Sequence, residues 1–62
     1  IMPTLEVTVI QGEREKHVTT PCKGLVDAKN LVTYFAERWV IVGDPYFVDG
    51  KRKIKLALPG GD

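Results

Sequence analysis

The sequence predicts an α+β fold in which one helix packs on one face of a small, mainly antiparallel sheet of four or five strands. Apolar residues alternate with polar ones near both ends of the chain, which is the period-two pattern of strands. One central stretch has apolar residues in steps of three and four, which is typical of a helix. The expected order is therefore strand, strand, helix and two or three strands, within a single domain over 1–62 that ends in a tail at 58–62.

The first two strands are expected to form a hairpin. Leu5, Val7 and Val9 alternate with polar residues, so one face of this strand is buried. Residues 11–15 are polar and contain a glycine, which favours a turn, and residues 16–20 are rich in the β-branched types of a returning strand. Pro21 ends that strand because proline has no amide hydrogen for the ladder.

The helix is expected to begin near Leu25, after Lys23-Gly24. Asp27 lies near its start, where a carboxylate interacts with free amide hydrogens and the positive end of the helix dipole. Arg38 lies in the last turn, where a cation is favourable. The helix therefore covers about four turns, with one apolar face.

The last strands are expected to form a second hairpin. Residues 40–42 are β-branched, 43–45 break or bulge the strand, and 46–48 resume it. Asp49-Gly50 predicts the two central residues of a type I′ turn. This turn would place Val48 opposite Lys51 and Tyr46 opposite Lys53, in a final strand over 51–58.

One helix can cover only one face of this sheet, so the other face is expected to be polar or an interface. The apolar positions that face the helix define the predicted core: Leu5, Val7, Val9, Val18, Leu31, Val32, Phe35, Trp39, Val42, Phe47, Ile54, Leu56 and Leu58.

The composition excludes several classes of protein. Of the 62 residues, 44% are apolar and 27% charged, and the net charge is +1, which is ordinary for a globular domain. Cys22 and His17 are the only cysteine and histidine, too few for a disulfide or a closed zinc site, so we expect no metal and no cofactor. The lack of paired cysteines favours a reducing, cytoplasmic location. No apolar run approaches the roughly 18 residues of a membrane span.

Catalysis is not expected. A pairing of His17 with Cys22 would be needed for thiol chemistry, but one is placed on a strand and the other in a loop. Glu13 and Glu15 belong to a solvated turn, and no phosphate-binding glycine loop or calcium loop occurs. Cys22 lies near a helix start that can lower a thiol pKa, so it remains a candidate reactive thiol.

A basic cluster suggests nucleic acid as one ligand class. Lys51, Lys53 and Lys55 share one face of the last strand at a spacing of about 6.6–7 Å, similar to that of successive phosphates. With Arg52, Lys16 and a neighbouring aromatic ring, they have the elements of a platform for single strands. Lysines on a strand also keep sheet edges from pairing, which is the alternative interpretation.

Protein binding is the function that we expect from the sequence. A regulator, inhibitor or accessory subunit of this size would dock on an acidic partner surface, or offer a sheet edge for strand addition. Self-association is a further alternative. The expected partner-binding residues combine aromatic, apolar and basic side chains: Tyr46, Val48, Lys51, Lys53, Lys55 and Tyr34.

The element order followed by Gly60-Gly61 resembles the ubiquitin-like β-grasp layout and its small sulfur-carrier relatives. The resemblance implies a carrier whose terminal diglycine is activated and holds the cargo. Two features depart from that pattern, because Asp62 follows the diglycine and the stretch between the helix and the last strand is short. A carrier would therefore need its tail trimmed, and we do not transfer that role.

Overall fold

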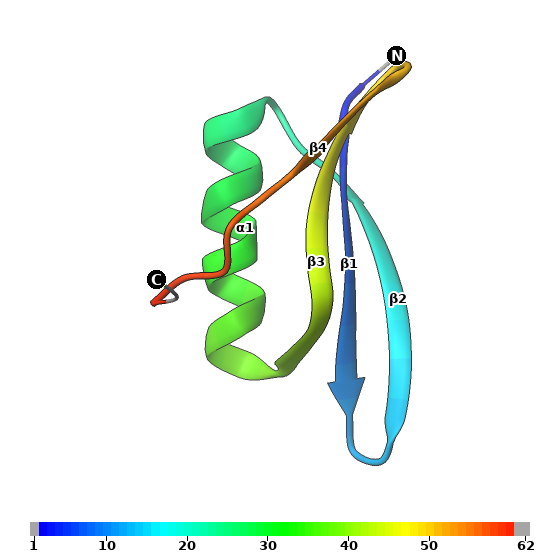
Figure 1. Cartoon of the computed structure of the whole chain (residues 1–62), viewed down its shortest axis with the longest axis vertical. Helices are drawn as coiled ribbons and strands as arrows, with labels where there is room; N and C mark the ends of the chain where they lie inside the picture. Colours follow the sequence, from blue (N-terminus) through cyan, green and yellow to red (C-terminus); the bar gives the residue numbers. More distant parts are fainter. Residues whose placement is uncertain (1, 61–62) are drawn as a thin grey trace.

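Four antiparallel strands and one helix make up the chain in a computed structural model that describes residues 2–60 (Figure 1). The sheet has the strand order β2-β1-β3-β4, and every neighbouring pair is antiparallel. The elements are β1 (Thr4–Gln11), β2 (Arg14–Pro21), α1 (Leu25–Arg38), β3 (Val40–Asp49) and β4 (Arg52–Lys55). The predicted α+β class, with one helix between the second and third strands, is confirmed.

The strand β1 lies in the centre of the sheet and pairs with both β2 and β3. Its alternating pattern behaves as predicted, because Leu5, Val7 and Val9 are all buried under the helix. The residues between them point to the opposite face. Each strand therefore has a helix-facing side and a side that no element of the described chain covers.

The helix α1 packs on β1 and β3. Its N-cap is Gly24, and the carboxylate of Asp27 in the first turn accepts a hydrogen bond from the backbone N–H of Lys23 at 2.8 Å. Ala28 and Val32 are buried against the sheet, and Trp39, which is extended, ends the helix. The helix thus begins and ends where the sequence predicts.

A bulge lies in the middle of β3. Glu6 pairs with Tyr46 and Thr8 pairs with Val42, so a single residue of β1 lies opposite residues 43–45 of β3. Gly43 adopts a φ of 72°, a left-handed conformation that favours glycine. Pro45 is buried, and its carbonyl accepts a hydrogen bond from the N–H of Leu56 at 2.9 Å. The strand therefore continues through the predicted break, which gives four strands rather than five.

The turn between β3 and β4 differs from the prediction. Asp49 pairs with Arg52, so the two loop residues are Gly50 and Lys51, and only Gly50 has a positive φ, of 61°. This pattern is that of a type II′ turn, which needs glycine only at its first central position. The register consequently moves by two residues, so Val48 lies opposite Lys53 and Tyr46 opposite Lys55. A shift of two preserves the face on which each side chain lies.

Most of the predicted core is confirmed, with two corrections. Val42 is wrong because its partner Thr8 points away from the helix, and Leu58 is wrong because β4 ends at Lys55 and leaves that side chain 37% exposed. The prediction missed Cys22, Ala28 and Pro45, which are buried. Other predicted core residues are half-buried and pack against the cluster: Val18, Leu31, Phe35, Trp39 and Ile54.

Candidate functional site

No element of the described chain covers the sheet face opposite α1. We call it the uncovered face. Its β2 side is polar, its centre mixes apolar and polar side chains, and its β4 side is basic. The register assigns these residues to it: Glu15, His17 and Thr19 of β2; Thr4, Glu6, Thr8 and Ile10 of β1; Val40, Val42, Tyr46 and Val48 of β3; Lys53 and Lys55 of β4.

The β3–β4 side of this surface contains four of the residues that the sequence singled out, and a fifth, Lys51, lies in the turn beside it. We define the hairpin face as Tyr46, Val48, Lys51, Lys53 and Lys55. Hydrogen-bonded and non-hydrogen-bonded pairs alternate along antiparallel strands. The hydrogen bond from Leu56 N–H to the Pro45 carbonyl therefore shows which β3–β4 pairs are of each kind. Val48–Lys53 and Tyr46–Lys55 are therefore non-hydrogen-bonded pairs, in which side chains lie closest together.

Tyr46 and Lys53 are in direct contact. The Nζ atom of Lys53 lies 4.7 Å from the centroid of the Tyr46 ring, which is a cation–π geometry. The two residues are diagonal neighbours across the ladder, within reach of a long side chain. The expectation of an aromatic ring beside the lysines is thus correct, although the residue directly opposite Tyr46 is Lys55.

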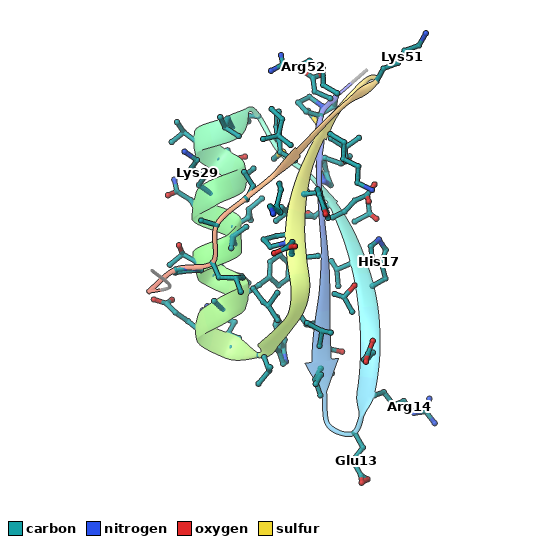
Figure 2. All side chains as sticks on the ribbon, viewed as in Figure 1. Glu13, Arg14, His17, Lys29, Lys51 and Arg52 are labelled. Atoms are coloured by element: carbon teal, nitrogen blue, oxygen red, sulfur yellow. The ribbon has the colours of Figure 1, made fainter. Side chains whose placement is uncertain are left out.

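The tip of the hairpin separates Lys51 from Arg52. Figure 2 shows the two side chains pointing in opposite directions from the end of the sheet, with Arg52 directed to the side on which the helix lies. The basic cluster predicted as four adjacent cations is therefore a row of three lysines with one arginine apart from it.

Within residues 2–60, none of these cations forms an ion pair with a carboxylate. Arg38 forms an ion pair with Glu37, and the contact of His17 with Glu6 is an ion pair only when the imidazole is protonated; neither contact involves β4 or its turn. Although the chain as a whole carries a charge of only +1, this edge of the sheet has a local excess of positive charge beside a half-buried tyrosine. Such a surface can attract an anionic group and bury an apolar one.

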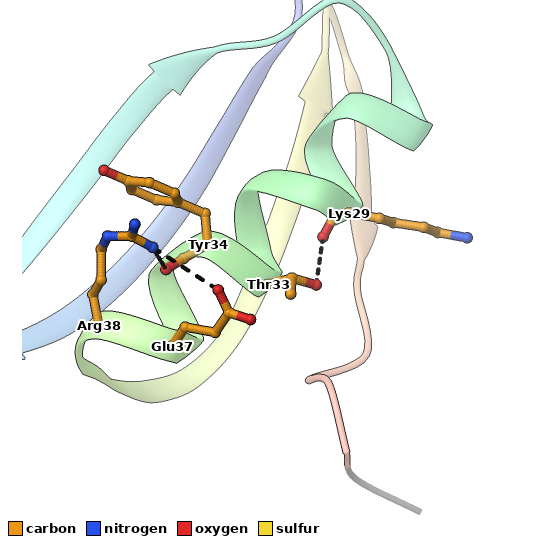
Figure 3. Close-up of polar contacts among 5 residues, drawn as sticks. All are labelled: Lys29, Thr33, Tyr34, Glu37 and Arg38. Carbon is orange, nitrogen blue, oxygen red and sulfur yellow. Dashed lines mark hydrogen bonds and ion pairs between the residues drawn. The ribbon is translucent and has the colours of Figure 1, made fainter.

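Tyr34 lies on α1, which covers the opposite face of the sheet, so it does not belong to the hairpin face. The guanidinium carbon of Arg38 lies 3.6 Å from the centroid of its ring, and Arg38 Nη1 donates a hydrogen bond to the Tyr34 carbonyl at 3.1 Å (Figure 3). The ring also packs edge-to-face on Phe35. The six predicted partner-binding residues therefore do not form a single surface.

Lys16 also lies apart from the basic row. It belongs to β2, at the opposite edge of the sheet from β4, and pairs with Val9, which faces the helix. A nucleic-acid strand lying along β4 would not reach it on the same face. The strand order therefore places Lys16 and the β4 cations at opposite edges of the sheet.

His17 and Cys22 are not a catalytic pair. His17 lies on the uncovered face, where Nδ1 is hydrogen-bonded to the Thr8 hydroxyl at 3.1 Å and Nε2 lies 4.0 Å from Glu6. Cys22 lies in the core on the other side of the sheet. Burial, followed by the nearby Asp27 carboxylate, raises the pKa of the Cys22 thiol, which is the opposite of the lowering expected from a helix start.

Other parts of the described chain show weaker evidence of a binding site. An open depression lies at the start of α1, but there the Asp27 carboxylate already accepts a backbone N–H. Among the described residues, no three His, Cys, Asp or Glu side chains gather as metal ligands, and no helix is long and apolar enough to cross a membrane. Gly61 and Asp62, on which the carrier interpretation depends, lie outside the described residues.

Sequence reasoning missed the neighbours of the hairpin face. Thr4 and Glu6 fall at alternate positions of β1, so their shared orientation was available from the period-two pattern. Their position beside Val48 and Tyr46 depends on the pairing of β1 with β3, which no local signal specifies.

Comparisons with known proteins do not place the chain in a family, because no protein-family model, no curated protein and no solved structure matches it.

Proposed function

We propose that this chain is a small, non-enzymatic binding module that docks the hairpin face on an acidic protein surface. The observation that carries the proposal is the contact between Lys53 and Tyr46 within a row of lysines that form no ion pair with a carboxylate in residues 2–60. A regulator, inhibitor or accessory subunit would act through such a surface without chemistry of its own.

The two kinds of side chain on this surface have different roles. Exposed ion pairs each add little affinity, typically 0–1 kcal/mol, but a row of like charges accelerates encounter with an oppositely charged surface. Tyr46 and Val48 are half-buried and present apolar area between the lysines and Glu6. Aromatic side chains supply much of the binding energy in protein interfaces, so Tyr46 is the expected anchor.

The geometry favours a protein over a nucleic acid as the partner. A stacking platform needs free aromatic faces for successive bases, and such surfaces combine several rings with a basic groove. Here Tyr46 is the single Phe, Tyr or Trp side chain that residues 2–60 place on the uncovered face, and the Lys53 ammonium group already lies over its ring. A carboxylate can meet Lys53 in that position, whereas a base would have to displace it.

The test is capture of partners from native cell extract, at low and high salt and with nuclease, followed by affinity measurement on the captured protein. Tyr46→Ala should weaken binding at least tenfold and more than any single lysine change, because the anchor contributes most of the affinity. Lys53→Glu should slow association and reduce its dependence on salt.

Two controls match these variants. Lys29→Glu makes the same charge reversal on the exposed surface of α1 (Figure 2), and Tyr34→Ala removes the tyrosine that lies on the helix. Both variants should bind the captured partner with an affinity within about twofold of that of the unaltered chain. Loss of capture after nuclease treatment, or equal affinity for Tyr46→Ala and the unaltered chain, would contradict the proposal.

A further inference from the structure

The strand β4 forms one outer edge of the sheet, so half of its backbone groups have no partner strand. Its Arg52 and Ile54 belong to hydrogen-bonded pairs with β3, in step with the bond from Leu56 N–H to the Pro45 carbonyl. The N–H and C=O groups of Lys53 and Lys55 consequently point away from the sheet. This edge presents two donors and two acceptors to an added strand.

The same two residues carry their side chains on the hairpin face. Residues that lie directly opposite each other on neighbouring strands share a face, so an added strand would place one side chain opposite Lys53 and another opposite Lys55. Carboxylates at those two positions would meet lysines that lack a carboxylate partner in residues 2–60. Acidic side chains at alternate positions thus match this edge.

The intervening positions of an added strand would point toward the helix side. There, α1 packs on β1 and β3 and leaves Ile54 of β4 only half-buried. An apolar side chain at the intervening position would extend the core over Ile54. The edge therefore fits a strand that is acidic on one face and apolar on the other.

From this match we propose that the partner contributes an extended segment with alternating acidic and apolar residues, which adds to the free edge of β4. This inference rests on the proposed function, because it specifies how the partner meets the hairpin face. Main-chain hydrogen bonds to Lys53 and Lys55 supply affinity, and the two carboxylates set the register.

The other edge of the sheet is a poorer fit for such a segment. On β2, the backbone groups that point away from β1 belong to the residues in non-hydrogen-bonded pairs. These residues are Glu15, His17, Thr19 and Pro21. Proline has no N–H to donate, and the Glu15 carboxylate repels an acidic strand. A second copy of the chain, offering β2 to β4, would bring one carboxylate against two lysines and is the weaker match.

The test uses an acetylated, amidated peptide of alternating Glu and Val, titrated into the isotope-labelled chain and followed by NMR. Binding should slow amide hydrogen exchange at Lys53 and Lys55 and leave Glu15 and His17 unchanged. The proposed pairing is antiparallel, like every other pair of this sheet, so the Glu residues opposite Lys53 and Lys55 bond to β4 through their backbone, whereas the Val backbone groups point away.

Backbone N-methylation supplies the matched controls, because it removes N–H donors without changing charge. A peptide N-methylated at its Glu residues should bind at least tenfold more weakly, and one N-methylated at its Val residues should bind as the parent does. Equal binding of the two methylated peptides would overturn strand addition while leaving an acidic partner in place.

Two further outcomes would contradict the proposal. If no peptide perturbs the hairpin face while a captured partner still depends on Tyr46, strand addition is wrong and the proposed function stands. If sedimentation shows that the chain associates with itself, and Lys55→Glu abolishes this association, the occupant of the edge is a second copy. If no peptide binds the hairpin face and Tyr46→Ala also leaves the affinity for the captured partner unchanged, the proposed function is overturned as well.

Discussion

Cys22 lies in the core between β2 and α1, where 2% of its surface is exposed. Its backbone N–H donates a hydrogen bond to the Pro3 carbonyl at 3.0 Å, which extends the β1–β2 ladder by one pair. Because the folded chain disfavours the thiolate there, this side chain acts as a small apolar core residue. At the residue scale, the burial of this thiol favours a role in core packing over a role as a reactive group.

We predict that Cys22 reacts with a thiol reagent at least 100-fold more slowly in the folded chain than in urea at pH 8. Burial removes the sulfur from solvent, and the raised pKa of Cys22 lowers the fraction of thiolate. Absorbance with an aromatic disulfide reagent measures the rate. Lys29→Cys in a Cys22→Ala background is the exposed control and should react at similar rates in both conditions. A fast reaction of Cys22 in the native chain would contradict its burial.

At the scale of the element, two predictions for the second hairpin had different outcomes: the face of each lysine and the type of the turn. The alternation of β4 specified the face of each lysine, and that prediction survived a register shift because the shift was two residues. The turn type did not follow from Asp49-Gly50, because a glycine is accepted at the first position of one turn type and the second of another. The pairing of Asp49 with Arg52 decides between them.

We predict that Gly50→Ser lowers the free energy of unfolding by about 1–2 kcal/mol, because a side chain is unfavourable at a φ of 61°. No atom lies within 4 Å of the position that a Cβ would take, so the cost comes from the backbone alone. Urea denaturation followed by circular dichroism measures it.

Gly24→Ser is the matched control for that change. Gly24 has an extended φ of 172° at the N-cap of α1, where serine is at least as favourable as glycine. Its free energy of unfolding should change by less than about 0.5 kcal/mol or increase. Equal losses in the two variants would show that the turn does not require glycine.

At the scale of the whole molecule, the element order and the face of each strand were predictable because both follow from local periodicity. Strand order was not, since the pairing of β1 with β3 brings together residues that are distant in sequence. The candidate site divides in the same way: Tyr46, Val48 and the lysines were found through one hairpin, whereas the separation of Tyr34 and Lys16 from them required the tertiary structure. The burial of Leu56 beyond the end of β4 likewise depends on its bond to Pro45.

We predict that Leu56→Ala destabilises the chain by about 2–5 kcal/mol, enough to unfold a domain of this size, because it leaves a cavity in the single core. Leu58→Ala should cost less than about 1 kcal/mol, since that side chain is partly exposed and lies outside the core cluster. Thermal denaturation at matched concentrations compares the two. Similar effects of the two changes would contradict the placement of the segment after β4.

The bulge at residues 43–45 also limits the shape of any docked partner. A bulge bends its strand and increases the local twist, so the patch around Tyr46 and Val48 is not coplanar with the patch around Val40 and Val42. A flat surface cannot rest on both patches at once. The footprint of a partner is therefore either confined to the half of the sheet that carries the lysines, or curved to follow the bend.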